Sequence, residues 1–446
     1  MSTAKWTTGV MVACVLLLGC SRAGAQDWPQ WRGPNRDAKA TGFDAPKTWP
    51  KELTQKWKVT VGDGVASPAL VGDKVYVFTR EGGDEVVRCL STADGKEVWK
   101  EKYPSADWRG ADSGFVAPRS SPAVADGKVV TLGATGILTC FDAGTGKQLW
   151  QKDDFKGSRP MFHVASSPII VDGLCIAQVG GRENGQRDGK ENGGIVAYDL
   201  ATGNEKWKWT GDGPGYASPV LMTLDGTKAI VAETDGNVVA LGAADGKQLW
   251  KTAFKVRYNA CTPVLDGQTV IYSGSAGGGM RRGGGGGGGG GAAGGGTKAV
   301  KLEKKGDELA AKDLWSNADS VVIYNTPVVK KGLIFGISDG GKLFCINEDT
   351  GKTAWSVAAP AAGGGGGGGG RGMMGGGAGY GSVVDAGSVL FALTPAGELV
   401  VFEPSDKEYK EIAKYKVGQN TYAYPVVSGK RVFVKDKDSL TLWTIE

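Results

Sequence analysis

Short runs of alternating apolar and polar residues recur along most of the chain, and Asp/Gly turns separate them. Runs such as "DKVYVFTR" (73–80) and "DGKVVTLGA" (126–134) are rich in β-branched residues. Alternation with a period of two is typical of strands that bury one face, and Asp-Gly pairs favour tight hairpin turns. The pattern therefore predicts an all-β chain of short antiparallel strands.

Two markers recur in a fixed order among these predicted strands. One is a turn that ends in tryptophan, as in "DAGTGKQLW" (142–150) and "NEDTGKTAW" (347–355); the other is a small residue followed by proline, as in Ser121–Pro122. The turn marker ends at Trp99, Trp150, Trp207, Trp250 and Trp355, with degenerate copies at Trp315 and Tyr409. The proline marker begins at Ser67, Ser121, Ser167, Ser218, Thr262 and Thr326, with worn copies at Ser382 and Tyr424.

Four strands per repeat, with a period of about 40–60 residues, indicate the blades of a β-propeller rather than a helical solenoid. Eight repeats begin, and the last has only three strands before the chain ends. The segment "ELTQKWKV" around Trp57 supplies the missing strand, and this closure would remove the exposed sheet edge. We therefore predict an eight-bladed propeller of four-stranded antiparallel blades over residues 51–446. Its outer strands would dock through Trp57, Trp99, Trp150, Trp207, Trp250, Trp315 and Trp355.

The cysteines beyond the N-terminus follow the same repeat. Cys89, Cys140 and Cys345 occupy the third-strand position that Ala197, Ala240 and Val401 hold in other blades. With Cys175 and Cys261 they make an odd number and contain no C-x-x-C spacing. We therefore interpret them as core residues rather than as disulfide or redox groups.

The first 25 residues have the pattern of an export signal. Lys5 precedes the apolar run "VMVACVLLLG", which is too short for a mature transmembrane helix. Two processing sites remain open: "LLGC" resembles a lipobox and would leave a lipidated Cys20, whereas "AGA" (23–25) would release a chain that begins at Gln26. Residues 26–50 then form a leader before the propeller.

The turn and proline markers together resemble those of the pyrroloquinoline-quinone (PQQ) repeat propellers. This family contains quinoprotein dehydrogenases and also the non-enzymatic lipoprotein of outer-membrane barrel assembly. The opening "DWPQWRGPNRD" (27–37) resembles the leader of PQQ-like repeat proteins of unknown role. The resemblance implies a propeller fold, but a shared fold does not by itself establish a reaction.

The dehydrogenase parts that the resemblance implies are mostly missing. No two cysteines are adjacent, and no C-x-x-C-H motif for haem attachment is present. The calcium ion of these enzymes is held by Glu, Asn and Asp, for which Glu233 and Asn259 are the candidates here by position. The single histidine, His163, excludes multi-histidine metal sites.

Charge and glycine content restrict the choice of partners. The net charge of +5 over 446 residues includes no long basic block, so nucleic acid is not indicated. Many of the 75 glycines lie in two loops, 277–296 and 363–379, where "MRRGGGG" and "GGRGMMGGG" occur. These tracts either are neutral expansions or tether contacts with a partner.

Large insertions are predicted on one face of the disc only. The turns between first and second strands and between third and fourth strands read as uniformly tight, whereas the other connections carry every insertion. Because loops on a rigid scaffold often carry function, we expect this loop-rich face to be the binding face. Its aromatic residues either stack between blades or form a binding rim. The candidate residues are Trp108, Arg109, Arg119, His163, Tyr216, Arg257, Tyr258, Tyr324, Tyr380 and Tyr422.

These observations favour an exported, non-catalytic scaffold that binds protein partners at the cell envelope, with or without a lipid anchor at Cys20. No cofactor is expected for that role. The alternative is an alcohol or sugar dehydrogenase that uses PQQ with Ca²⁺. A third hypothesis is a binder of small molecules or glycans in the axial channel.

Overall fold

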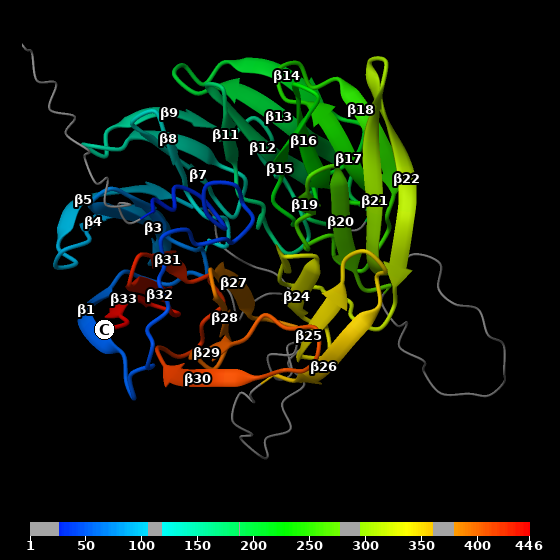
Figure 1. Ribbon diagram of the computed structural model, residues 1–446. Helices are drawn as coiled ribbons and strands as arrows, with labels where there is room; N and C mark the ends of the chain where they lie inside the picture. Colours follow the sequence, from blue (N-terminus) through cyan, green and yellow to red (C-terminus); the bar gives the residue numbers. More distant parts are fainter. Residues whose placement is uncertain (1–25, 106–117, 187, 277–294, 360–378) are drawn as a thin grey trace, which may run out of the picture.

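Eight antiparallel sheets surround one axis, and each is built from consecutive parts of the chain (Figure 1). The computed structural model describes residues 26–105, 118–186, 188–276, 295–359 and 379–446. These contain 33 strands and no helix, so within these ranges there is no apolar helix long enough to cross a membrane. The predicted all-β, eight-bladed propeller is confirmed.

We number the blades along the chain and give their strands from the axis outward. Blades 1 and 2 consist of β2 (Ala69–Val71), β3 (Lys74–Glu81), β4 (Asp84–Ser91), β5 (Glu97–Pro104) and of β6 (Ala123–Ala125), β7 (Lys128–Leu132), β8 (Leu138–Asp142), β9 (Gln148–Lys152). Blades 3 and 4 consist of β11 (Ile169–Val171), β12 (Leu174–Glu183), β13 (Glu191–Asp199), β14 (Glu205–Trp209) and of β15 (Val220–Leu224), β16 (Thr227–Glu233), β17 (Asn237–Gly242), β18 (Gln248–Ala253). A short strand, β10 (Ser158–Arg159), pairs with the far end of β12.

The remaining blades follow the same order. Blades 5 and 6 consist of β19 (Val264–Asp266), β20 (Thr269–Gly274), β21 (Gly296–Lys305), β22 (Glu308–Asn317) and of β23 (Val328–Lys330), β24 (Leu333–Ile337), β25 (Lys342–Asn347), β26 (Thr353–Ala358). Blades 7 and 8 consist of β27 (Ser382–Ala386), β28 (Val389–Leu393), β29 (Glu398–Phe402), β30 (Glu411–Lys416) and of β31 (Val426–Ser428), β32 (Arg431–Lys435), β33 (Ser439–Thr444), β1 (Thr54–Thr60).

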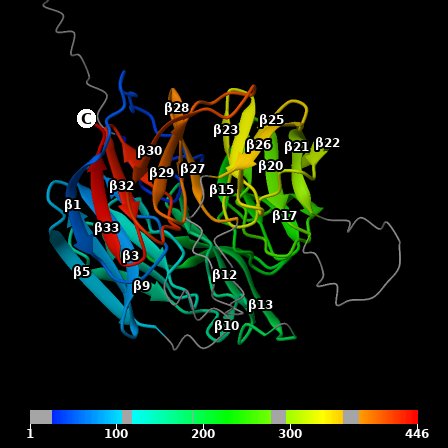
Figure 2. The ribbon, with the colours of Figure 1, turned by 90° about the horizontal axis from the view of Figure 1, so that it is seen from below.

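Blade 8 joins the two ends of the propeller. Its outermost strand is β1, which pairs antiparallel with β33 from Thr54 opposite Thr444 to Thr60 opposite Ser439. The two strands lie side by side in Figure 2, blue beside red. The predicted closure by the N-terminal strand is therefore confirmed, and this pairing gives β33 a neighbour on both sides.

The repeated tryptophan docks on the turn of the next blade. The Trp99 indole donates from Nε1 to the carbonyl of Ala143 (3.0 Å) and covers Gly146, where an added Cβ would lie 2.7 Å from the ring. Gly146 has φ +79°, which also favours glycine. The arrangement recurs where Trp57 covers Gly95, Trp150 covers Gly203, Trp207 covers Gly246 and Trp315 covers Gly351. The G-x-x-x-W spacing, with Thr or Asp before the glycine, therefore encodes both halves of one contact between blades.

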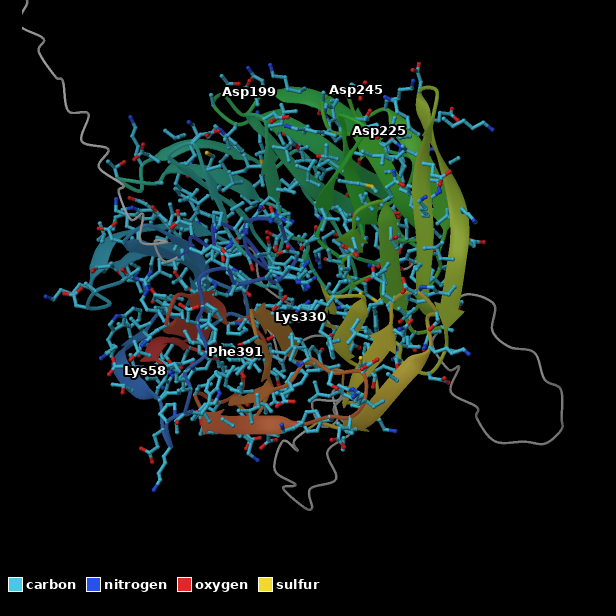
Figure 3. The ribbon with its side chains drawn as sticks, in the orientation of Figure 1. Lys58, Asp199, Asp225, Asp245, Lys330 and Phe391 are labelled. Carbon is cyan, nitrogen blue, oxygen red and sulfur yellow. The ribbon has the colours of Figure 1, made fainter. Side chains whose placement is uncertain are left out.

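The Asp of the same turn fixes its shape. Asp199 Oδ1 accepts hydrogen bonds from the backbone NH of Thr202 (2.9 Å) and from its hydroxyl (3.0 Å). These bonds lower the pKa of Asp199 below its ordinary value. Asp199 and Asp245 lie at the outer edge of the ring (Figure 3). Such Asx turns explain why Asp, Thr and Gly recur together.

The cysteines fill the position predicted for them. Cys89, Cys140 and Cys345 each pair directly with a docking tryptophan, as Ala197 and Ala240 do in blades 3 and 4. All five cysteines of the described ranges are buried and free. Burial raises the pKa of the Cys89 thiol to about 11, so it is protonated and unreactive at neutral pH.

Blade 5 departs from the prediction that every enlargement lies on one face. Strands β21 and β22 continue past the Trp315–Ala299 pair for six more pairs, down to Lys305 opposite Glu308. This hairpin extends toward the face of the tight turns, so the expectation that every large insertion lies on the other face does not hold for blade 5. Its turn is tight, but the alternating residues "KLEKK" and "ELAAK" lengthen the strands themselves.

A ring of hydrogen bonds around the axis explains the small residue before proline. The backbone NH of one marker donates to the hydroxyl of the next, as from Ser67 to Ser121 (2.9 Å) and from Ser121 to Ser167 (2.9 Å). The series continues through Ser218, Thr262 and Thr326. Thr326 donates to the Tyr424 hydroxyl (2.9 Å), and Tyr424 NH donates to Ser67 Oγ (2.8 Å). The long Tyr424 side chain thus reaches across blade 7 and completes the ring.

Candidate functional site

The two ends of the axis differ. We call one the tight-turn face, which carries the turns between first and second and between third and fourth strands. The other is the loop-rich face, which carries the remaining loops and the crossings between blades. The leader occupies the axis from the tight-turn face: Trp28 pairs with Leu70 of β2, and the Ser428 hydroxyl at the end of β31 donates to Gln26 O (2.7 Å). A ligand of the axis is therefore expected to enter from the loop-rich face.

The loop-rich face carries a continuous arc of aromatic rings, which we call the aromatic rim. Consecutive ring centroids lie 4.4–6.3 Å apart from Tyr216 through Phe162, Tyr258, Tyr324 and Tyr380 to Tyr422. Tyr324 and Tyr380 are stacked, with centroids 4.4 Å apart and planes at 9°. The structure thus brings together the five tyrosines that the sequence placed in one phase, and Phe162, which the sequence places in a similar phase, lies against Tyr216 and Tyr258.

Positive side chains lie beside this rim. The Arg257 guanidinium is 5.0 Å from the Tyr258 ring centroid and is exposed. Arg119 donates from Nη1 to the carbonyl of Phe162, which ties blade 2 to the rim. His163 is buried and has φ +65°, so it serves the conformation of this loop rather than presenting its ring to solvent. Trp108 and Arg109 lie outside the described residues, as do Cys20 and most of both glycine tracts.

Most rim side chains are partly buried. Tyr216, Tyr258, Tyr380 and Tyr422 are of intermediate exposure, whereas Tyr324 is 37% exposed. Stacking between blades and an accessible outer surface therefore coexist in the same rings. Aromatic and Arg side chains with this partial exposure are typical of protein-binding surfaces.

Below the rim, the Glu233–Asn259 pair lies fully inside the protein. Asn259 Nδ2 donates to Glu233 Oε1 (3.1 Å) and to the carbonyl of Phe254 (3.0 Å). Glu233 Oε2 has no hydrogen-bond partner, and the side chain is 0% exposed. Burial raises the pKa of Glu233 well above its ordinary value, and the hydrogen bond from Asn259 opposes this only in part. Burial therefore favours the protonated, neutral form of the Glu233 carboxyl.

One position in the second strand of each blade explains how this polar group arises. In each blade the core residue of the third strand pairs with a residue of the second strand, and the position meant here lies two residues after that partner. Blades 3, 4 and 5 have polar residues there, namely Gln178, Glu233 and Ser273. Blades 1, 2, 6 and 7 have apolar residues there, namely Phe78, Leu132, Ile337 and Leu393. Gln178 Nε2 donates to the carbonyls of Ala217 (2.7 Å) and Glu233 (3.1 Å). The sequence analysis missed Gln178, although the change from apolar to polar at one repeat position was available as a signal.

Blade 8 carries a buried cation at the same position. Lys435 Nζ donates to the carbonyls of Gly64 (3.0 Å), Asp436 (2.6 Å) and Lys437 (3.0 Å) and, more weakly, of Gly62 (3.3 Å). Burial lowers the pKa of Lys435 to about 8. These bonds join the crossing between β1 and β2 to the turn after β32, so Lys435 secures the ring where its ends meet.

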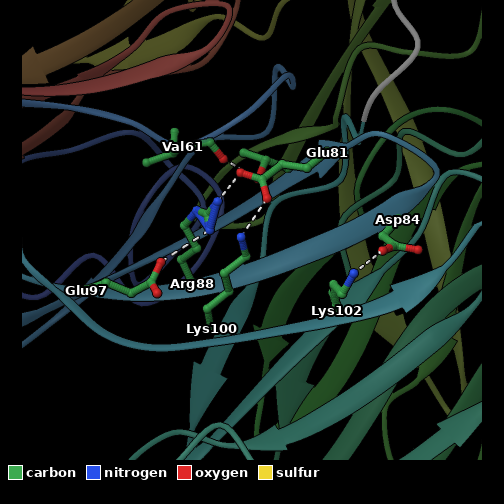
Figure 4. A network of polar contacts seen from close by, with 8 residues as sticks. Val61, Glu81, Asp84, Arg88, Glu97, Lys100 and Lys102 are labelled. Atoms are coloured by element: carbon green, nitrogen blue, oxygen red, sulfur yellow. Dashed lines mark hydrogen bonds and ion pairs between the residues drawn. The ribbon is translucent and has the colours of Figure 1, made fainter.

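Surface charges on blade 1 pair among themselves. Arg88 contacts both Glu81 and Glu97, and Lys100 Nζ lies 2.6 Å from Glu81 Oε2 (Figure 4). Lys102 and Asp84 form a further pair (2.7 Å). These pairs brace the β3–β4–β5 strands, and they neutralise one another instead of forming a patch of one sign.

The residues around Glu233 fit the quinone and calcium group only in part. Glu233 and Asn259 are two of the three oxygen ligand types that the resemblance implies. Within the described ranges, no group of three His, Cys, Asp or Glu side chains is arranged to hold a metal ion. The pKa of Glu233 is moved by burial and by Asn259, with no contribution from a neighbouring carboxylate. We therefore derive no catalytic step through this group.

Comparison with known proteins gives one family and several distant relatives. A family model described as outer membrane protein assembly factor BamB matches residues 36–208, 191–282 and 341–446. Quinohemoprotein alcohol dehydrogenase ADH-IIG of Pseudomonas putida is 30% identical over 157 residues, 35% of this chain and 21% of the enzyme. BamB of Burkholderia pseudomallei is 28% identical over 207 residues, 45% of this chain and 46% of that protein. The matches thus span less than half the length of these curated relatives.

Solved structures agree with the fold. BamB from Moraxella catarrhalis has a TM-score of 0.58 at 15% identity and covers 88% of this chain and 100% of its own. The alcohol dehydrogenase ADHIIG from Pseudomonas putida has a TM-score of 0.62 at 14% identity and covers 94% of this chain and 80% of its own. At such identities the likeness shows a shared propeller and nothing about activity.

Proposed function

Because the chain belongs to the family of the outer membrane protein assembly factor BamB, we propose that it is a non-catalytic scaffold outside the cytoplasm. It would hold protein partners on its loop-rich face. The observation that carries this proposal is the aromatic rim, in which Tyr324 and Tyr380 stack while Tyr324 stays 37% exposed. Partly exposed aromatic rings beside the exposed Arg257 provide contact area at low entropic cost, as binding hot spots do.

The test is site-specific photocrosslinking in intact cells. A photoreactive residue replaces Tyr324 at the rim or, as a control, exposed Leu149 on the outer strand β9. We expect a discrete crosslinked band from position 324 that is absent at position 149, and its loss when Arg257→Ala is added. Equal bands at both positions, or none at the rim, would contradict a rim-directed scaffold.

The dehydrogenase alternative has one observation in its favour, the Glu233–Asn259 pair at the axis. It is tested by calorimetric titration of residues 26–446 with PQQ, with and without Ca²⁺. Binding that requires Ca²⁺ and is lost in Glu233→Gln would favour the enzyme over the scaffold. A flat titration would leave the scaffold as the proposal that fits.

Attachment to a membrane is a separate part of the proposal. Cleavage before Cys20 would leave a lipid-modified N-terminus, whereas cleavage after Ala25 would release a chain that begins at Gln26. The intact mass of the mature protein distinguishes these two products. Substitution Cys20→Ser is expected to release the protein from the membrane fraction only in the first case.

A further inference from the structure

The inner strands of the blades leave backbone groups directed at the axis. Each first strand is short, three to five residues, and has a neighbour on one side only within its blade. Unpaired edge groups of this kind favour the addition of another extended segment. The leader provides such a segment: Trp28 NH donates to Leu70 O (2.7 Å), Leu70 NH returns the bond (2.8 Å), and Val124 NH donates to Pro29 O (2.8 Å).

Arg36 inserts its guanidinium among carbonyls of the proline markers. Nη1 donates to Ser167 O (3.1 Å) and Pro219 O (2.8 Å), and Nη2 donates to Pro168 O. Nε donates to Gln30 Oε1 within the leader (2.9 Å). The side chain is buried, and burial lowers its pKa to about 9. Every nitrogen of this guanidinium is therefore hydrogen-bonded, and all of its acceptors are neutral oxygens.

Arg32 reaches the opposite side of the ring. Nη2 donates to Pro327 O of blade 6 (2.6 Å), and the guanidinium carbon lies 5.5 Å from the ring centroids of Trp31 and Tyr424. Arg32 is 0% exposed. The same Tyr424 completes the hydroxyl ring, so Arg32 connects the leader to the closure of the propeller.

The leader touches almost every blade before it leaves the axis. Beyond blades 1, 2, 3, 4 and 6, Ala40 NH donates to Asp385 O of β27 (2.7 Å), and Ser428 of blade 8 binds Gln26. Asp385 is itself fixed by the buried Lys330, 2.5 Å from its Oδ1 (Figure 3 labels Lys330). Seven of the eight blades thus hydrogen-bond to the leader, with blade 5 as the exception among the described contacts.

We propose that the tight-turn end of the axis is a binding site for a peptide that pairs with an inner strand at Trp28 and then turns to present two arginines, and that the leader is its resident ligand. The carbonyls of Ser167, Pro168 and Pro219 form the receptor for one guanidinium, and Pro327 O with the Tyr424 ring forms the receptor for the other. A planar guanidinium directs its donors at fixed angles toward such separate acceptors, whereas a lysine ammonium presents its three donors from a single atom. This inference goes beyond the scaffold proposal and does not depend on it.

The experiment converts the leader from a covalent part into a ligand. A protease site is inserted in the full chain at exposed Lys47–Thr48, which leaves Trp49 packed against Phe391 and Tyr415. After cleavage, a labelled synthetic peptide of residues 26–43 is added, and its exchange into the axis is followed by fluorescence anisotropy. We expect the cleaved leader to stay bound through gel filtration and the labelled peptide to replace it at saturable occupancy.

Peptide variants make the test specific without affecting the fold of the propeller. Arg36→Ala and Arg32→Ala are each expected to weaken binding at least tenfold, and Arg36→Lys is expected to recover only part of the loss. Asn35→Ala is the matched control, because Asn35 is exposed between the two arginines. Release of the leader on cleavage without loss of thermal stability, or equal binding of the double Arg→Ala peptide, would overturn the proposal.

Discussion

The inner strand edges are covered in different ways at the two ends of the axis. At the tight-turn end, a segment of the chain itself covers the inner strand edges, and Trp28, Arg32 and Arg36 are buried there. At the loop-rich end, side chains cover the opening, and the outermost ring, Tyr324, stays 37% exposed. The first end is thus filled by the leader of the same chain, whereas the second end keeps a ring accessible to a separate partner.

The comparison also separates two kinds of polar interior. Around the leader, guanidinium groups meet backbone carbonyls, which every blade presents by virtue of the repeat. Under the rim, Glu233 meets the Asn259 side chain, whereas Gln178 and Lys435 bind backbone carbonyls. Glu233, Gln178 and Lys435 each stand at a repeat position that is apolar in most other blades. The first kind follows from the fold, whereas the second depends on a few individual residues.

The largest expected difference between the ends is in stability. Trp28→Ala removes a fully buried indole and should lower the free energy of unfolding by about 3–5 kcal/mol. Tyr324→Ala should lower it by less than about 1 kcal/mol, because that ring is only partly buried. Denaturant unfolding of both variants provides the measurement. Similar losses would mean that the rim is as structural as the leader.

A buried cation at the loop-rich end should matter next. Lys435→Met leaves the carbonyls that Lys435 binds without their donor, and we expect a loss of about 2–3 kcal/mol in the free energy of unfolding. Lys437→Met is the control, because the Lys437 side chain is exposed. If both variants unfold at the same denaturant concentration, Lys435 does not secure the closure of the ring.

Glu233 should make stability depend on pH. Its pKa is raised in the folded state, so the folded protein binds more protons than the unfolded one, and stability should fall as pH rises above about 4.5. Glu233→Gln removes this titrating group. The pH dependence of the free energy of unfolding should therefore become less steep, by up to about 1.4 kcal/mol per pH unit. Thermal unfolding between pH 5 and 8 should show a flatter profile for the variant. An unchanged slope would place the effect on another acid such as Glu85, which is also fully buried and whose pKa is raised by that burial.

The smallest stability effect is expected at the rim itself. Arg257→Ala removes an exposed cation–π contact with Tyr258 and should change the free energy of unfolding by no more than about 1 kcal/mol. It should nevertheless reduce partner crosslinking from position 324. A variant that unfolds normally and still crosslinks fully would show that Arg257 is not part of the binding surface.

The fold could be predicted closely from the sequence because most blades carry the same markers at the same spacing. The same spacing recurs in successive blades between the docking tryptophan, its turn and the core position that pairs with it. The Cys140–Trp150 pair of blade 2 therefore predicts the corresponding pair in the next blade. The enlarged hairpin of blade 5 escaped prediction because its added strand residues, 300–305 and 308–313, carry no turn signal that separates them from the rest of their strands.

Features that occur once could be located but not explained. The leader residues Arg32 and Arg36 belong to no repeat, and their acceptors are backbone carbonyls of distant blades, which leave no trace in side-chain identity. The proline markers were visible, but the role of their hydroxyls depends on the distance between neighbouring blades. The rim tyrosines shared a phase, and only the folded arrangement brings their rings into contact.

The pairing of β1 with β33 restricts the order in which the newly synthesised chain can fold. Thr54 meets Thr444, so the first strand stays without its partner until the last residues have been synthesised and, if the chain is exported, delivered. Contacts of such long sequence separation form slowly, and unpaired strands are prone to aggregate. The ring therefore cannot close before β33 has been made, and β1 has an unpaired edge until then.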